Sequence, residues 1–211
     1  DLPICQFFGE DLYGQEVGPY RIERALGGGG FGQVFGARRR DDGSRAAVKI
    51  MRPAYVVSRE AVKRFEREAA CAARLEHPNI VRIFDFGAWR ETMYFAMEWI
   101  EGQSLWDLVE AQGPLPESRA LEIITQCAHA LAHAHKAGVI HRDIKPGNIM
   151  IAAGERVKLV DFGLAKDLMA TAITKPGARM GTFQYMTPEQ LRGDPVDLRC
   201  DLYGLGLLWW Q

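Results

Sequence analysis

Apolar and polar residues alternate through the first part of the chain in a pattern that predicts β-strands. Three such runs cover residues 20–26, 34–38 and 46–51. A glycine cluster separates the first two runs, and the turn sequence Asp41-Asp42-Gly43 separates the second from the third. Because alternating runs joined by short turns are typical of hairpins, we expect an antiparallel sheet here.

A helical period replaces this alternation over residues 58–76. Apolar residues there recur at steps of three and four among arginine and glutamate, which predicts an amphipathic helix that ends at His77-Pro78-Asn79. Strand-like runs follow at 80–86 and 93–99. Residues 101–103 are interpreted as a link to the rest of the chain.

The second half of the chain is mostly helical in pattern. Helices are expected over residues 104–112 and 117–137 and from residue 200 onward, with two short strands at 149–151 and 157–160. A polar stretch between the second strand and the last helix has little periodicity, and long loops of this kind are usually functional.

Composition narrows the class of protein. The 211 residues include 26 Lys and Arg against 27 Asp and Glu, with 47% hydrophobic and 25% charged residues, which is close to the average for soluble globular domains. The length allows one or two domains with ample core. This balance excludes a disordered chain and argues against a nucleic-acid partner that binds a broad basic surface.

The sequence also suggests a compartment. The four cysteines are scattered without a CxxC pair, which favours a reducing environment. The first residues have no basic segment followed by an apolar core, so they do not resemble a signal peptide. No run reaches the ~18 apolar residues of a membrane-spanning helix. We therefore expect a cytoplasmic location and no membrane span within this chain.

A glycine-rich segment suggests phosphate binding. Residues 27–34 read Gly-Gly-Gly-Gly-Phe-Gly-Gln-Val and contain the pattern G-x-G-x-x-G-x-V. Glycines let backbone N–H groups approach phosphate oxygens without interference from a Cβ atom. A ligand-free glycine turn is an equal alternative on this segment alone. A dinucleotide-binding turn is disfavoured, because its third glycine opens a helix and here Val34 begins a strand.

Lys49 lies at the end of the apolar run Ala46-Ala47-Val48. A buried ammonium group is costly unless it meets an anion, so a phosphate and a helical glutamate are its candidate partners. Glu66 and Glu68 both qualify by position, and Glu68 is favoured by its distance from the predicted end of the helix. An ordinary lysine at a sheet edge is the alternative.

The second half of the chain holds a dense group of polar residues that carry chemistry. Residues 141–148 read His-Arg-Asp-Ile-Lys-Pro-Gly-Asn, Asp161-Phe162-Gly163 follows a predicted strand, and Thr187-Pro188-Glu189 comes later. With the glycine loop and Lys49, these motifs occur in the order of the eukaryotic-type protein kinase signature. From Tyr20 to its end, the chain resembles a serine/threonine protein kinase domain and is most similar to bacterial ones.

The resemblance implies a bilobal α+β fold. Residues 1–19 would be a lead-in, and residues 20–100 an N-lobe with an antiparallel sheet, one helix and the glycine-rich loop. Residues 101–211 would be part of a mostly helical C-lobe that carries the catalytic and activation loops but lacks the family's last helices. A membrane anchor outside these residues stays open.

The resemblance also implies ATP and Mg²⁺ as cofactors and protein serine or threonine hydroxyls as acceptors. Asp143 matches the carboxylate that orients the attacking hydroxyl and accepts its proton. Asn148 and Asp161 match the oxygen ligands of Mg²⁺. Lys49, fixed by Glu68, would hold the α- and β-phosphates.

Two further residues match the γ-phosphate side of the site. Lys145 corresponds to the lysine typical of serine/threonine kinases, and Thr182 would complete that pocket. Met97 would be the gatekeeper beside the adenine, and the backbones of Glu98 and Ile100 would bind it. The residues expected around the nucleotide are Leu26, Gly27, Gly28, Gly29, Gly30, Phe31, Gly32, Val34, Ala47, Lys49, Met97, Glu98, Ile100, Met150 and Asp161.

Regulation is expected in the loop after Gly163. Arg142 and Lys166 would form a cationic pocket for a phosphate, with Thr171 or Thr174 as the autophosphorylated residue. Plain loop threonines are the alternative.

The last part of the chain raises three expectations. Asp201 would anchor the catalytic loop, and Glu189 would lack the arginine with which it pairs in the family. The apolar residues of that helix are expected to form an exposed patch, consisting of Leu205, Leu207, Leu208, Trp209 and Trp210.

Two other functions stay open at this point. A catalytically silent nucleotide-binding or scaffolding module would share the fold, although Lys49, Asp143, Asn148 and Asp161 are all present. A kinase for small molecules is less favoured because of Lys145. A zinc site at His129 and His133 is disfavoured, since no further ligand motif accompanies them.

Overall fold

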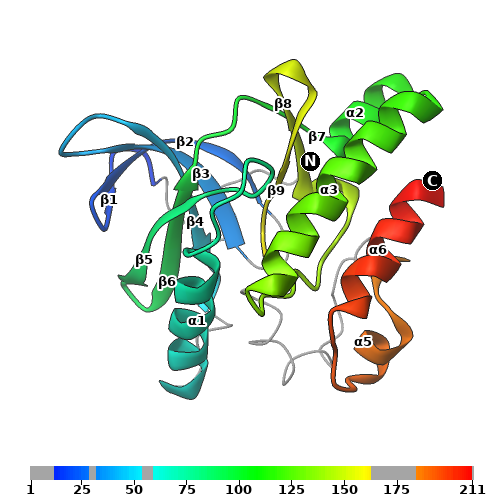
Figure 1. The fold of residues 1–211 in the computed structure, drawn as a ribbon. Coiled ribbons are helices and arrows are strands. Elements are labelled where there is room, and N and C mark those ends of the chain that lie inside the picture. Colours follow the sequence, from blue (N-terminus) through cyan, green and yellow to red (C-terminus); the bar gives the residue numbers. More distant parts are fainter. Residues whose placement is uncertain (1–11, 29–31, 54–58, 163–183, 211) are drawn as a thin grey trace. The chain divides into compact units, whose positions relative to one another are not determined.

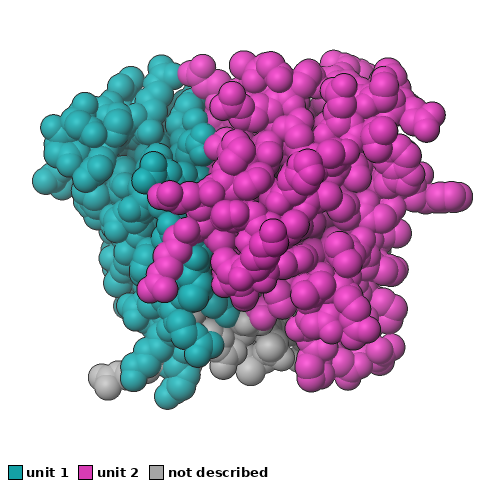
Figure 2. Space-filling view, viewed as in Figure 1, with its two compact units in different colours: residues 1–73, 82–99, 167–174 teal, residues 74–81, 100–166, 175–211 magenta. Residues whose placement is uncertain are grey.

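The computed structural model describes residues 12–28, 32–53, 59–162 and 184–210. Contacts within the chain divide it into two compact units (Figure 2). The sheet unit comprises residues 1–73, 82–99 and 167–174, and the helical unit comprises residues 74–81, 100–166 and 175–211.

An antiparallel sheet dominates the sheet unit, as the alternation predicts (Figure 1). Its six strands lie in the order β1-β2-β3-β4-β6-β5. The one described helix of this unit, α1, covers Arg59–Ala72. The strands are β1 (Glu16–Val17), β2 (Tyr20–Gly28), β3 (Gly32–Arg39), β4 (Arg45–Met51), β5 (Ile83–Trp89) and β6 (Thr92–Glu98).

The two faces of this sheet differ because side chains alternate along each strand. Phe35, Ala37, Val48, Ile50 and Ala96 point into a core on one face. Lys49 and its neighbours in register point to the other face. The face opposite the core therefore carries four of the residues expected around a nucleotide, namely Val34, Ala47, Lys49 and Met97.

Residues 12–19 belong to the sheet unit, which differs from a simple lead-in. Leu12 and Val17 are buried in its core. Strand β1 pairs with β2, and the indole N–H of Trp89 donates to the carbonyl oxygen of Glu16 at 2.8 Å. The weak apolar pattern of this segment hid these contacts, because only two of its side chains enter the core.

Helix α1 ends at Ala72, several residues before the predicted end. The reason is that the next residues pack in the helical unit. Leu75 enters the core of that unit, and the Asn79 amide donates to the carbonyl oxygen of Val157 at 2.9 Å and to the side chain of Gln126 at 2.8 Å. Tertiary contacts thus end the helix at Ala72, although the helical pattern of the sequence continues beyond it.

The helical unit is built around a long central helix. Helix α3 buries one face against the strands and against α6 (Figure 1). No described helix is both long and apolar enough to cross a membrane. The elements of this unit are β7 (Gly102–Ser104), α2 (Leu105–Gln112), α3 (Glu117–Lys136), the 3₁₀ turn η3 (Pro146–Asn148), β8 (Ile149–Ala152), the 3₁₀ turn η4 (Ala153–Glu155), β9 (Arg156–Leu159), α5 (Pro188–Arg192) and α6 (Arg199–Trp210).

The two units meet in sequence next to the predicted link at 101–103, but the prediction did not include strand β7, which residues 102–104 form. This strand pairs with β8 and completes a three-stranded sheet with β9. A Cβ atom on Gly102 would lie 2.1 Å from the carbonyl oxygen of Ile151, so only glycine permits this pairing. The strand is too short for alternation to reveal it.

Two glycines of α6 give a matched test of the packing beneath residues 141–148, the predicted catalytic loop. A Cβ atom on Gly204 would lie 2.9 Å from the Cβ atom of Ile144, whereas one on Gly206 would meet nothing within 4 Å. Gly204→Ala should therefore lower the free energy of unfolding by about 1–3 kcal/mol through overpacking. Gly206→Ala should raise it by about 0.5–1 kcal/mol, because alanine loses less backbone entropy in a helix. Urea denaturation measures both, and equal effects would contradict the close approach of α6 to Ile144.

Candidate active site

The catalytic loop, residues 141–148, is anchored by a buried carboxylate from α6. Asp201 is fully buried and accepts hydrogen bonds from the backbone N–H groups of His141 at 2.8 Å and Arg142 at 2.7 Å. The ring Nε2 of His135 lies 2.8 Å from the same carboxylate. This is the anchoring role that the sequence suggested for Asp201. Because three groups from two segments converge on it, Asp201 ties the loop to both α3 and α6.

His141 is a structural residue in its neutral form. Its Nε2 lies 2.9 Å from the carbonyl oxygen of Val160, which can only accept, so Nε2 carries the proton. The other ring nitrogen accepts the backbone N–H of Asp143 at 3.2 Å. The ring is fully buried, which lowers the pKa of His141, and it packs 4.6 Å from the ring of Phe162. His141 therefore joins the loop to the end of β9.

Asp143 lies at the centre of the polar cluster that the sequence predicts. Its carboxylate accepts the Lys145 ammonium at 2.7 Å and the Asn148 amide N–H at 2.8 Å. The same Asn148 amide also donates to the Asp143 carbonyl oxygen. The side chain of Asp143 is 8% exposed, so a small part of the carboxylate remains accessible to another group. The structure thus brings together three of the five residues predicted to be catalytic.

The backbone of the loop is held in an uncommon conformation at Arg142. This residue has a φ of 64°, in the left-handed region that side chains disfavour. Its N–H donates to Asp201, and its carbonyl oxygen accepts the Gln190 side chain at 2.8 Å. Because both backbone groups are tied, the neighbouring Asp143 is presented in a defined direction. Such conformations cluster at active sites.

Gln190 is a residue that the sequence interpretation missed. It is part of a capping box with Thr187 at the start of α5. The pattern Thr187-x-x-Gln190 carried that signal, since a polar residue three positions after a capping threonine commonly closes such a box. Its second role, holding Arg142, depends on tertiary structure alone.

The expected Mg²⁺ ligands are chemically suited to that ion. Asn148 uses its amide nitrogen for Asp143, which directs the amide oxygen toward other partners. Its backbone carbonyl accepts the N–H of Val160 at 3.0 Å, next to Asp161 in sequence. Asp161 has a φ of 59°, a second left-handed residue at the site. An amide oxygen and a carboxylate are the hard donors that Mg²⁺ prefers.

The sheet unit gathers several residues expected around the nucleotide on one face. Val34 pairs with Lys49, and Ala47 pairs with Met97, so these side chains share the face opposite the core. Lys49 is buried, with its ammonium 5.8 Å from the centre of the Phe95 ring. It is therefore not an exposed lysine at a sheet edge.

The remaining expected residues lie in three places. Leu26, Gly27, Gly28 and Gly32 lie on the β2–β3 hairpin, and Glu68 is half-buried on α1. Ile100, Met150 and Asp161 belong to the helical unit. Outside the described residues lie Gly29, Gly30, Phe31, Gly163, Lys166, Thr171, Thr174 and Thr182.

Comparison with known proteins identifies the family. Residues 20–211 match the family described as protein kinase domain. The chain belongs to the protein kinase family. The kinase PrkC of Bacillus subtilis is 40% identical over 201 residues, and PknB of Mycobacterium leprae is 41% identical over 197 residues; both are named serine/threonine-protein kinases.

The match covers most of this chain but only part of these relatives. It includes 95% of the chain and 31% of PrkC, and 91% of the chain and 32% of PknB. The solved PknI kinase domain of Mycobacterium tuberculosis shares the fold, with a TM-score of 0.78 and 32% identity over 95% of this chain and 76% of that one. The kinase fold expected from the sequence is confirmed.

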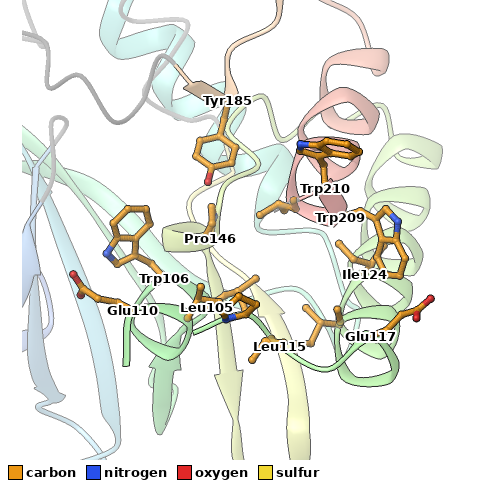
Figure 3. Close-up of a pocket in the computed structure, with 15 residues that line it drawn as sticks. Leu105, Trp106, Glu110, Leu115, Glu117, Ile124, Pro146, Tyr185, Trp209 and Trp210 are labelled. Atoms are coloured by element: carbon orange, nitrogen blue, oxygen red, sulfur yellow. The ribbon is translucent and has the colours of Figure 1, made fainter. Parts of the chain in front are cut away.

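A separate apolar pocket of about 490 Å³ lies within the helical unit of this kinase chain (Figure 3). Helices α2, α3 and α6 line it, together with Pro146 and Tyr185. Trp209 and Trp210 border it and are 45% and 87% exposed, so this part of the predicted exposed patch is present. Leu205 was wrongly included in that patch, because it is buried against the core beneath the catalytic loop.

Two histidines, His141 and His77, predict how stability depends on pH. Burial lowers the pKa of His141, and burial with the nearby His133, His129 and Lys158 lowers the pKa of His77. As the pH falls below ~6.5, these two histidines therefore bind protons more readily in the unfolded chain than in the folded chain. Stability should be full above that pH and decrease as the pH drops below it.

Urea denaturation between about pH 5 and pH 7.5 tests this dependence. The slope should reach up to about 1.4 kcal/mol per pH unit for each histidine that titrates. The ring of His77 accepts the backbone N–H of Asn79 at 3.1 Å. His77→Asn retains a short acceptor without a titrating ring, so it should reduce the slope. A slope unchanged by this substitution would remove His77 from the explanation.

Proposed function

We propose that this chain transfers the γ-phosphoryl group of ATP to serine or threonine hydroxyls of proteins, with Mg²⁺ as the required metal. The observation that carries the proposal is the cluster of Asp143, Lys145 and Asn148, joined by hydrogen bonds and held by Asp201. Phosphoryl transfer needs mainly positioned groups and charge neutralisation, which such a rigid cluster supplies.

Each residue has a defined task in the proposed reaction. The acceptor hydroxyl oxygen bonds to the γ-phosphorus, while the bond from that phosphorus to the bridging oxygen of ADP breaks. Asp143 orients the hydroxyl and accepts its proton. Lys145, within 2.7 Å of Asp143, neutralises charge on the transferred group. Mg²⁺, held by Asn148 and Asp161, would neutralise charge on the β- and γ-phosphates.

The nucleotide would be held mainly by the sheet unit. Lys49 binds the α- and β-phosphates, and Glu68 orients it. The adenine lies against the face that carries Val34 and Ala47. The N–H of Glu98 donates to the carbonyl oxygen of Arg82 at 2.8 Å, which holds the backbone at this point. The carbonyl oxygen of Glu98 would accept the adenine amino group.

Two lines support protein serine and threonine as acceptors. The relatives PrkC and PknB are named serine/threonine-protein kinases. Lys145 lies two residues after Asp143, as the resemblance to serine/threonine kinases implies. Residues 20–100 and 101–211 would serve as the N-lobe and the C-lobe, and Thr171 or Thr174 would receive a phosphate from the same chain.

Intact-mass measurement after incubation with Mg-ATP tests the proposal. The wild-type chain should gain the mass of one or more phosphoryl groups, and a protein substrate should yield phosphoserine or phosphothreonine after hydrolysis. Omitting Mg²⁺ should abolish both signals. Nucleotide binding without transfer would favour a silent binding module instead, and transfer only to a metabolite would favour a small-molecule kinase.

A further inference from the structure

Trp99 has an unusual position at the end of strand β6. It lies between Glu98 and Ile100, whose backbones are proposed to bind the adenine. Its side chain is half-buried. A Cβ atom on Gly36 in strand β3 would lie only 2.8 Å from the indole Cζ3 atom of Trp99. The ring of Trp99 therefore rests directly on the backbone of β3, at a position that only glycine leaves open.

The register of the sheet shows which face the indole covers. Gly36 pairs with Ala47, and two residues earlier on β3, Val34 pairs with Lys49. Paired residues, and residues two apart on one strand, point to the same face of a sheet. The Trp99 ring therefore lies on the face that carries Val34, Ala47 and Lys49, beside the proposed adenine site.

Two arginines lie over the ring of Trp99. The guanidinium carbons of Arg24 and Arg45 lie 5.5 Å and 5.8 Å from the centre of the Trp99 ring, within the range of cation–π attraction. The buried indole N–H makes no hydrogen bond to any described residue. The ring is thus held by stacking and contact, rather than by a directional polar bond.

The sheet itself fixes the backbone only as far as Glu98. Glu98 pairs with Ala46 of strand β4, and its N–H donates to the carbonyl oxygen of Arg82. Trp99 is the first residue beyond β6. The contact of its indole with Gly36 and the arginines extends this order by one residue, into the segment that would contact the adenine.

We propose that Trp99 is a positioning residue for ATP. Its indole ring holds the backbone of residues 98–100 in the conformation that binds the adenine. This inference rests on the proposed kinase function and names a residue for nucleotide affinity within it. A binding segment that is already ordered loses less entropy when the ligand binds. The affinity for ATP should therefore depend on the packing of the Trp99 ring against Gly36. The phosphoryl-transfer step, which depends on Asp143, should not depend on this packing.

The test compares KM for ATP, kcat and the calorimetric affinity for ATP with Mg²⁺. Trp99→Ala should weaken ATP binding and raise KM for ATP by about tenfold, with kcat changed by less than about threefold. Trp99→Phe should restore most of the affinity, because an aromatic ring remains and no N–H bond is lost. Gly36→Leu should reproduce the loss, because its side chain displaces the indole.

Trp89→Ala is the matched control. Trp89 also lies on the sheet unit, and the guanidinium carbon of Arg90 is 4.5 Å from the centre of its ring, but Trp89 follows no adenine-binding residue. This variant should leave the affinity for ATP unchanged even if it lowers the midpoint of thermal unfolding.

Three outcomes would overturn the inference. The first is an unchanged affinity for ATP in Trp99→Ala. The second is an equal loss in Trp89→Ala, which would indicate general destabilisation. The third is a loss in kcat that exceeds the rise in KM. Failure of the proposed function is distinguishable, because the wild-type chain would then bind no ATP in calorimetry or transfer no phosphate.

Discussion

Asp143→Asn should lower the rate of phosphoryl transfer by about 10²–10⁴-fold, the usual contribution of a positioned general base. The amide is nearly the same size as the carboxylate but cannot accept the proton of the acceptor hydroxyl. It also loses the charge that attracts Lys145, which lies 2.7 Å from the carboxylate. Affinity for nucleotide should change little, because the proposed role of Asp143 is to act on the acceptor hydroxyl.

Single-turnover transfer to a protein substrate and calorimetric binding of ADP together measure this effect. Asp194→Asn is a suitable control, because Asp194 lies in the same unit and forms an exposed ion pair with Arg192. Such surface pairs contribute about 0–1 kcal/mol, so this variant should retain full activity. A decrease of less than tenfold in Asp143→Asn would show that another group accepts the proton.

Asp201→Ala should lower the free energy of unfolding by about 3–5 kcal/mol, the cost of breaking a buried charged network. The fully buried carboxylate accepts the N–H groups of His141 and Arg142 and contacts the ring of His135. Removing it leaves these donors in an apolar interior without partners. The loss is a large part of a typical total stability of about 5–15 kcal/mol, so the helical unit should be the part that unfolds first.

Urea denaturation followed by hydrogen exchange of the helical unit measures this loss. Leu202→Ala is the matched control, because Leu202 is the next residue of α6 and is 53% exposed. It should change stability by no more than about 0.5 kcal/mol. If Asp201→Ala were equally mild, the catalytic loop would have to be anchored by other contacts, such as the bond from Gln190 to Arg142.

Much of this architecture could be predicted from the sequence because its signals are local. Alternation predicted strands β2, β3 and β4, and the helical period predicted the long helix α3 almost to its ends. The candidate catalytic residues were also recognisable, since Asp143, Lys145 and Asn148 lie within six residues of one another in a dense motif. Local structure and motif spacing depend mainly on neighbours in the chain, so the sequence carries them directly.

Tertiary structure alone decided which distant residues meet. The sequence suggested an anchor in Asp201, yet its shared use by His135, His141 and Arg142 required three segments to pack together. Strand β7 at residues 102–104 left no periodic signal in the sequence, and neither did the contact of the Trp99 ring with Gly36. Backbone pairing and close packing between remote segments are settled by the whole fold, because each contact depends on space that other elements leave open.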